Sequence, residues 1–199
     1  IDYFLSEGVT LAYAHSDCTY DEAMAAYARG LSVATHTGNV MTGLHHRDIG
    51  GLGAALNHEN VECEVICDGL HMHPASVRLA FRMFGVARIV LISDALRCCG
   101  MPDGAYELGG QQAYLQGGVA RLQDGTLAGS ATNLYDCMRR AISFGIAPED
   151  AIRAATWNPA CALGAEGEIG SIAVGKWADF VVCGPDFTRQ EVYLDGQKV

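Results

Sequence analysis

Short apolar runs alternate with segments of helical spacing along the first half of the chain. Four of these runs predict buried strands, at 9–14, 31–35, 61–67 and 88–93. The last run is almost entirely aliphatic, which is typical of a parallel strand covered on both faces. Helices are predicted between the runs, one from Thr19 to Arg29, where Thr19 and Glu22 fit a capping box, and one that begins at Pro74.

The pattern changes after the fourth strand. The segment 105–123 alternates between apolar and polar residues and is rich in glycine, which predicts a β-hairpin. Helices are predicted again at about 132–144 and 148–156. Toward the C-terminus, short apolar stretches and turns, including Ile172 and Val174, predict a small β-layer.

The alternation of strands and helices predicts βαβ units with a parallel sheet, so the fold class is α/β. Ionisable side chains stand where the strands end: His15, His36, Asp68 with His71 just beyond it, and Asp94. These are the positions at which a (β/α)8 barrel builds its active site. A whole barrel needs about 250 residues. The 199 residues, with their added β-layer, therefore predict about half a barrel, and the absence of a starting Met suggests a piece of a longer protein.

Composition narrows the choice of partners. Thirteen basic residues against 23 acidic ones give a net charge of −10, which argues against binding to nucleic acid or to an anionic membrane. No run approaches the ~20 apolar residues that a membrane helix needs. The eight cysteines are scattered without CxxC spacing, so we expect free thiols in a reducing cytosol rather than a disulfide scaffold.

His15 and His36 are candidate metal ligands, because imidazole nitrogen is a common ligand of zinc-like ions. Two ligands alone do not hold an ion, and the alternative for each residue is a hydrogen-bonded histidine of the core. Asp94 is a candidate proton carrier, which would take the proton of a metal-bound water and deliver it to the leaving group. The alternative for Asp94 is a cap for the turn that follows.

Two further clusters contain groups that bind anions. Arg47 follows His45 and His46, and its forked guanidinium suits phosphate or carboxylate. The segment 68–74 carries further histidines. The glycine-rich run 124–130 can bring its backbone close to a ligand, although no Lys follows it as in a P-loop. Solvated loops and a tight turn before a helix are the alternatives.

Taken together, these segments resemble the N-acetylglucosamine-6-phosphate deacetylase family of the amidohydrolase superfamily. The resemblance covers nearly the whole chain and follows the order of the family's motifs. It is carried by residues 14–16, 35–41, 46–47, 68–71, 93–95, 125–130, 158–160 and 175–179. Each motif is weak alone, whereas the ordered succession is specific, and the Thr-His and Asp-Gly-Leu-His motifs favour this family over other amidohydrolases.

The resemblance implies a metal-dependent hydrolase that converts N-acetylglucosamine 6-phosphate and water to glucosamine 6-phosphate and acetate. By matching position, His15 and His36 would be ligands of a divalent metal, with zinc expected and iron as the alternative. Asp94 would be the general base and then the general acid.

The resemblance also implies how a phosphorylated amino sugar would be bound. His71 would contact the sugar, and Leu127 would lie in a loop that lines the sugar site. Asn39 and the backbone at Val40 would help at the phosphate end. Arg47 matches an arginine that reaches the phosphate in the neighbouring subunit, which implies a homodimer.

In this family a metal-binding Glu and a His that holds the acetyl carbonyl belong to the preceding half of the barrel. The chain is therefore expected to be the C-terminal portion of a cytoplasmic enzyme, with residues 1–163 as a partial (β/α)8 barrel and 164–199 as a small β-sandwich annex. Two alternatives stay open. One is an inactive C-terminal fragment that needs an N-terminal partner half, and the other is an amidohydrolase acting on N-acyl amino acids or cyclic amides.

Overall fold

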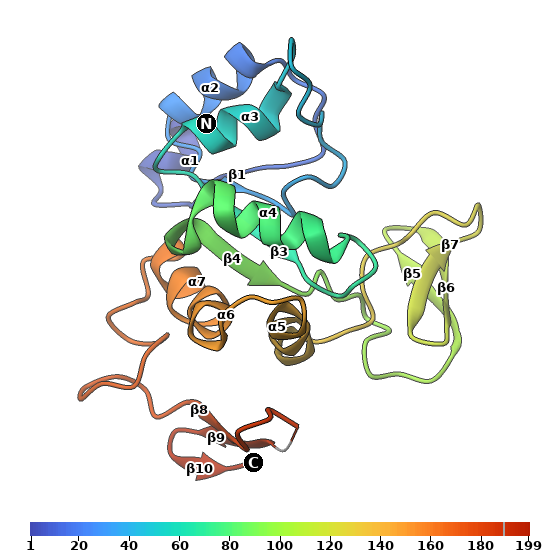
Figure 1. Cartoon of the computed structure of the whole chain (residues 1–199), viewed down its shortest axis with the longest axis vertical. Helices are drawn as coiled ribbons and strands as arrows, with labels where there is room; N and C mark the ends of the chain where they lie inside the picture. Colours follow the sequence, from blue (N-terminus) through green and yellow to red (C-terminus); the bar gives the residue numbers. More distant parts are fainter. Residues whose placement is uncertain (189) are drawn as a thin grey trace.

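A computed structural model describes residues 1–188 and 190–199. Its central element is a parallel sheet of four strands in the order β1-β2-β3-β4, with helices between consecutive strands (Figure 1). The strands are β1 (Ala12–Tyr13), β2 (Val33–Ala34), β3 (Glu62–Ile66) and β4 (Ile89–Ile92). All four predicted strands are confirmed, although β1 and β2 are shorter than their apolar runs.

Seven α-helices surround this sheet or extend from it in the described residues, together with a 3-10 turn at Val86–Arg88. The helices are α1 (Asp2–Ser6), α2 (Tyr20–Ala28), α3 (Gly50–Asn57), α4 (Pro74–Phe84), α5 (Leu134–Ser143), α6 (Pro148–Ala155) and α7 (Trp157–Ala162). Figure 1 shows α2 and α3 beside β1, α4 across β3 and β4, and α5, α6 and α7 together beyond β4. The capping box at Thr19 and Glu22 is present, so the predicted start of α2 is confirmed.

Helix α3 was not predicted, and its glycines explain why. Glycine lowers helix propensity by about 1 kcal/mol relative to alanine, and α3 contains three of them within eight residues. The helix nevertheless forms because it packs closely on α2 and on β1. A Cβ atom at Gly51 would lie 2.2 Å from the hydroxyl oxygen of Tyr13, so only glycine permits this approach.

Two antiparallel sheets accompany the parallel one. The predicted hairpin at 105–123 is wrong by one strand, since this region forms a three-stranded sheet of β5 (Gly104–Leu108), β6 (Gln111–Gln116) and β7 (Val119–Leu122). The second sheet lies near the C-terminus and contains β8 (Phe180–Cys183), β9 (Gln190–Leu194) and β10 (Gln197–Lys198).

The described residues of 164–199, which leave out residue 189, form one antiparallel sheet, and the β-sandwich stays a prediction. One part of the predicted β-layer is wrong. Ile172 and Val174 lie in a loop rather than a strand, with exposed fractions of 92% and 107%. A strand needs hydrogen-bonded neighbours, and this loop has none to pair with in the described chain.

The main core lies between the parallel sheet and its helices. It includes the side chains of Val65, Leu91, Val77, Phe81, Phe84, Cys137 and Ala151. Two polar side chains tie helices to this core. Asn158 of α7 is 1% exposed, and its Nδ2 donates to the carbonyls of Val86 and Ile89, each at 2.7 Å.

Arg88 is the second polar side chain that links helices to the core. Its guanidinium lies at the start of β4 and donates to five backbone carbonyl oxygens at 2.8 to 3.3 Å, those of Ala55, Leu56, His58, Val61 and Phe84. These carbonyls belong to the ends of α3 and α4 and to the loop before β3. The charged group therefore supplies the partners that helix-end carbonyls otherwise lack.

The other side of the parallel sheet opens onto a cavity of about 550 Å³. Ala12, Val33, Glu64 and Asp94 are among its lining residues, and Leu163, which is 70% exposed, stands at its border. Parallel sheets are normally covered on both faces. In the described chain, this face carries an ionisable cluster within an apolar surround.

Candidate active site

The four ionisable residues predicted at the strand ends occupy equivalent positions. Each lies two residues beyond the last residue of its strand: His15 after β1, His36 after β2, Asp68 after β3 and Asp94 after β4. The strands are parallel, and their register aligns His15 with His36 and Asp68 with Asp94. Between β2 and β3, Ala34 lies opposite Cys63, so Asp68 and Asp94 lie three residues further along the strand direction than the two histidines. All four residues follow the carboxyl ends of their strands, as predicted.

Backbone conformation marks the same positions. Six non-glycine residues of the described chain have a positive φ: His15 (45°), His36 (31°), Val40 (51°), Asp94 (50°), Phe187 (58°) and Asp195 (48°). Four of them were predicted as site residues from the sequence. This conformation costs a non-glycine residue of the order of 1 kcal/mol and persists only where the surroundings hold it, which is characteristic of functional sites.

The imidazoles of His15 and His36 face each other. Their Nε2 atoms are 2.8 Å apart and their ring centroids 4.7 Å apart. Two nitrogen lone pairs at this distance repel unless a proton or a cation lies between them. His36 is 8% exposed and His15 is exposed, so the pair has one buried and one accessible member.

This arrangement supplies part of a metal site. Two converging imidazole nitrogens suit zinc or a similar ion, and the Nδ1 of His36 is buried without a hydrogen-bond partner in the described residues. A third ligand is needed. Among residues 1–188 and 190–199, no group of three or more His, Cys, Asp or Glu side chains is placed to hold an ion. The two histidines therefore fit one side of a metal centre.

Two carboxylates lie on the cavity side of the sheet, and one of them contacts the backbone of His36. Glu64 of β3 accepts a hydrogen bond from the backbone N–H of His36 at 3.2 Å, and it lines the cavity together with Asp94. Burial raises the pKa of the Glu64 carboxyl, and the charge of Asp94 raises it further, whereas the contact with His36 lowers it. Asp94 is exposed. Solvent access suits a group that exchanges protons with water.

Asp68 and His71 form a second, buried pair. The Nδ1 atom of His71 lies 2.7 Å from a carboxylate oxygen of Asp68, and the two side chains are 9% and 2% exposed. Burial opposes ionisation of Asp68, but hydrogen bonds from the His71 ring and from the N–H groups of His71 and Leu70 outweigh it and lower the pKa of the carboxyl. An ionised Asp68 fixes the His71 proton on Nδ1, which leaves Nε2 free to accept a hydrogen bond.

The loop after β2 carries the remaining predicted residues of the anion cluster. Asn39 donates from its side-chain amide to the carbonyl of His36 at 3.1 Å, and Val40 is 68% exposed. Arg47 is exposed, and its guanidinium contacts the ring of His46. The His45 and His46 rings lie 4.2 Å apart. An exposed guanidinium of this kind is accessible to an anion.

The glycine-rich run returns to the strand ends. Ser130 pairs with Ala95, and its N–H donates to the carbonyl of Asp94 at 2.9 Å. Gly129 has a φ of 70°, and a Cβ atom there would lie 3.1 Å from the same carbonyl. Leu127 is half-buried. The loop that contains Leu127 is thus anchored directly beside Asp94.

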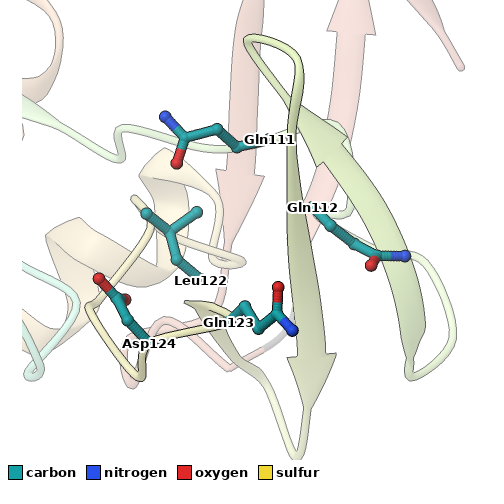
Figure 2. Close-up of a pocket in the computed structure, with 5 residues that line it drawn as sticks. All are labelled: Gln111, Gln112, Leu122, Gln123 and Asp124. Atoms are coloured by element: carbon teal, nitrogen blue, oxygen red, sulfur yellow. The ribbon is translucent and has the colours of Figure 1, made fainter.

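A separate hollow of about 310 Å³ lies on the antiparallel sheet of β5 to β7 (Figure 2). Figure 2 shows Gln111, Leu122 and Asp124 around it, while the Gln112 side chain extends to the other side. Its carboxylate, Asp124, is engaged by the N–H of Thr126, which lowers the pKa of the Asp124 carboxyl. This hollow contains none of the strand-end residues.

Two residues of the site were not predicted. Asp68 was noted as the end of a strand but not as the partner that orients His71, although its spacing of three residues is a usable signal. Glu64 was treated as part of an apolar run. A charged residue in the middle of a predicted buried strand was the available sign, since such residues are rarely buried without a partner.

The chain belongs to the amidohydrolase family, whose model matches residues 5–199. Divalent metals are general in this family.

Three similarities are more specific. The chain is 39% identical to N-acetylglucosamine-6-phosphate deacetylase of Vibrio furnissii over 100% of this chain and 50% of the relative. It is 37% identical to N-acetylgalactosamine-6-phosphate deacetylase of Escherichia coli O157:H7, over 99% of this chain and 52% of the relative.

The third similarity is to a solved structure. A D267A mutant of N-acetyl-D-glucosamine-6-phosphate deacetylase from Mycobacterium smegmatis, in complex with N-acetyl-D-glucosamine-6-phosphate, is 35% identical with a TM-score of 0.92. The match covers 98% of this chain and 52% of that one. The chain thus spans about half the length of each of these three proteins.

Two further observations bear on the sequence predictions. All eight cysteines are free, and four of them, Cys63, Cys67, Cys98 and Cys137, are buried. The helices in the described part of the chain are too short or too polar to cross a membrane.

Proposed function

We propose that this chain is the C-terminal part of a metal-dependent deacetylase of N-acetylglucosamine 6-phosphate. The observation that carries the proposal is that His15, His36 and Asp94 follow the carboxyl ends of their strands, each in a strained backbone conformation, and that the two histidine Nε2 atoms lie 2.8 Å apart. We propose further that residues 1–163 are half of a (β/α)8 barrel and that 164–199 belong to a small β-annex. The names of the relatives favour a phosphorylated amino sugar over N-acyl amino acids or cyclic amides.

The chemistry assigned to the strand ends is hydrolysis of an amide. His15 and His36 would hold a divalent ion, with zinc expected and iron as the alternative. Bound there, the ion would polarise the acetyl carbonyl and make water a better nucleophile. Asp94 would accept the proton that the water loses as it attacks the carbonyl carbon. It would then return this proton to the amide nitrogen as the C–N bond breaks, which gives acetate and the free amine.

The remaining residues would bind the sugar phosphate. His71, oriented by Asp68, offers Nε2 to a sugar hydroxyl, and the loop at Leu127 would border the sugar. Asn39 and the backbone of Val40 would lie toward the phosphate.

Arg47 would provide the main positive charge for the phosphate group. The guanidinium is exposed, which suits the expectation that it reaches the site of a neighbouring subunit in a homodimer. Eight free cysteines also suit the reducing cytoplasm proposed for this enzyme.

A second candidate substrate is N-acetylgalactosamine 6-phosphate, because one relative is named for that activity. The two sugars differ in the orientation of one ring hydroxyl, so the same metal and proton chemistry serves both. The choice between them concerns sugar contacts such as those of His71 and Leu127.

The test is a measurement of zinc content together with acetate release from both 6-phosphosugars. Non-phosphorylated N-acetylglucosamine is the control substrate, and His36→Ala is the control variant. We expect acetate from a phosphorylated sugar, much slower release from the control sugar, and loss of zinc in His36→Ala. Equal rates with and without the phosphate would contradict the proposed substrate. Bound zinc without acetate release would favour the inactive fragment that needs a partner half.

A further inference from the structure

The Nδ1 side of the His36 ring is not held by any side chain or carbonyl of the described residues. Metal-binding histidines usually donate their second ring N–H to a carboxylate or a carbonyl, which fixes the orientation of the ring. The Nδ1 atom of His36 is buried and has no such partner among the described residues. The direction of its Nε2 atom must therefore be set by the backbone at His36 and by packing around the ring.

That backbone is strained and needs external support. The φ of His36 is 31°, which costs free energy for any residue with a Cβ atom. β2 ends at Ala34, so His36 lies outside the ladder of regular strand hydrogen bonds. Residues of the neighbouring strand supply the support instead.

Glu64 of β3 supports the turn at His36 in two ways. Its carboxylate accepts the N–H of His36 at 3.2 Å, and its backbone carbonyl accepts the N–H of Thr37 at 2.7 Å. Thr37 is itself held by a hydrogen bond from its hydroxyl to the carbonyl of Ala34 at 2.8 Å. The left-handed turn at His36 is thus attached to β3 through both the side chain and the main chain of one residue.

Glu62, on the same strand, can be compared with Glu64. Glu62 lies two residues earlier and therefore on the same face of β3, since side chains alternate along a strand. Its Oε2 atom is buried and has no hydrogen-bond partner in the described chain. The two glutamates share a strand face and a side-chain type, but in the described chain only the Glu64 side chain hydrogen-bonds the turn that carries His36.

We propose that Glu64 is a positioning residue, whose carboxylate holds the left-handed backbone of His36 so that the His36 Nε2 atom faces the Nε2 atom of His15. This inference rests on the proposed function only in so far as it assigns a metal to these two histidines. The carboxylate acts as a hydrogen-bond acceptor, so the side-chain amide oxygen of a Gln in place of Glu64 should also accept the His36 N–H.

The first experiment measures zinc affinity in the protein after removal of its metal, by competition with a chromophoric chelator. Glu64→Ala should weaken zinc binding by about 10–100-fold, as loss of a group that orients a ligand does. Glu64→Gln should stay within about threefold of the unmodified protein, and Glu62→Ala should bind zinc normally. Unchanged affinity in Glu64→Ala would overturn the inference. So would a loss in Glu64→Gln as large as that in Glu64→Ala, because the charge rather than the acceptor would then matter.

The second experiment does not depend on the metal. Exchange of the His36 amide hydrogen with solvent is followed by NMR in the metal-free protein, with thermal unfolding as the control for global stability. Glu64→Ala should accelerate this exchange about tenfold, whereas Glu64→Gln and Glu62→Ala should not. If zinc affinity is the same in His36→Ala as in the unmodified protein, the proposed metal site fails, yet the exchange rates still decide whether Glu64 holds the turn.

Discussion

The carboxyl edge of the parallel sheet and the C-terminal annex differ in how their residues are held. At the edge, His36 and Asp94 have strained backbones; the His36 N–H donates to Glu64, and the Asp94 carbonyl accepts from Ser130, which attaches both to neighbouring segments. In the annex, Ile172 and Val174 are fully exposed, and Trp177 is 59% exposed. The edge is organised by contacts within this chain, whereas the annex presents apolar surface of the kind that another layer normally covers.

The face of the parallel sheet that lines the cavity also presents apolar surface, as the annex does. It opens onto the cavity of about 550 Å³ although its strands are mostly apolar. The residues at the strand ends are therefore held by contacts within the chain, whereas the apolar surfaces around them are left open. Four predictions examine this difference.

The largest expected effect is on chemistry at the edge. Asp94→Asn should lower turnover by about 10²–10⁴-fold, because the amide cannot accept the proton of the attacking water. Zinc content should be unchanged, since His15 and His36 are untouched. Asp21→Asn, at an exposed carboxylate in the first turn of α2, is the control and should be fully active. Near-normal turnover in Asp94→Asn, measured by acetate release, would exclude Asp94 as the proton carrier.

The next largest effect concerns the structure behind the edge. Arg88→Ala should lower the free energy of unfolding by about 3 kcal/mol, because several partly buried carbonyls lose their donor at once. Arg29→Ala is the matched control, since Arg29 forms an exposed ion pair with Asp2 and should cost less than about 1 kcal/mol. Urea denaturation of both variants checks this. Equal losses would mean that the hydrogen bonds of Arg88 contribute no more than a surface pair.

A smaller effect depends on pH. Burial raises the pKa of Glu62 from 4.5 to about 7. The folded state then binds a proton more tightly than the unfolded state, so this residue lowers stability as pH rises from about 4.5 to 7 and adds no further change above that window. Glu62→Gln should remove this penalty, which is about 1–2 kcal/mol at pH 8.

Urea denaturation at pH 5 and pH 8 measures the effect of Glu62. The gain in stability of Glu62→Gln over the unmodified protein should be larger at pH 8. A gain of the same size at both pH values would show that the Glu62 carboxyl titrates normally and that burial does not disfavour its charge.

The smallest effect is expected in the annex. Ile172→Ala should change the free energy of unfolding by less than about 0.5 kcal/mol, because the side chain is 92% exposed and buries no area in this chain. Ile89→Ala, at a fully buried position of β4, should cost about 2–5 kcal/mol. A large loss in Ile172→Ala would show that this loop is covered in solution.

The sequence by itself determined the elements that depend on local signals. The capping box at Thr19 and Glu22 defined the start of α2, and Pro74 marked the start of α4. The apolar runs that end in ionisable residues located the strand ends, because a charged side chain beside a buried strand is costly unless it has a partner. His15, His36 and Asp94 could therefore be selected before their distances were known.

Only the tertiary structure decided what depends on residues far apart in sequence. Helix α3 forms despite its glycines because Gly51 packs on Tyr13, and Ile172 lies outside any strand because none of the described residues pairs with it. The link between Glu64 and His36 spans 28 residues and exists only because β2 and β3 are adjacent and in register. Hydrogen bonds and packing contacts of this kind arise from the arrangement of the strands, which local patterns of hydrophobicity do not encode.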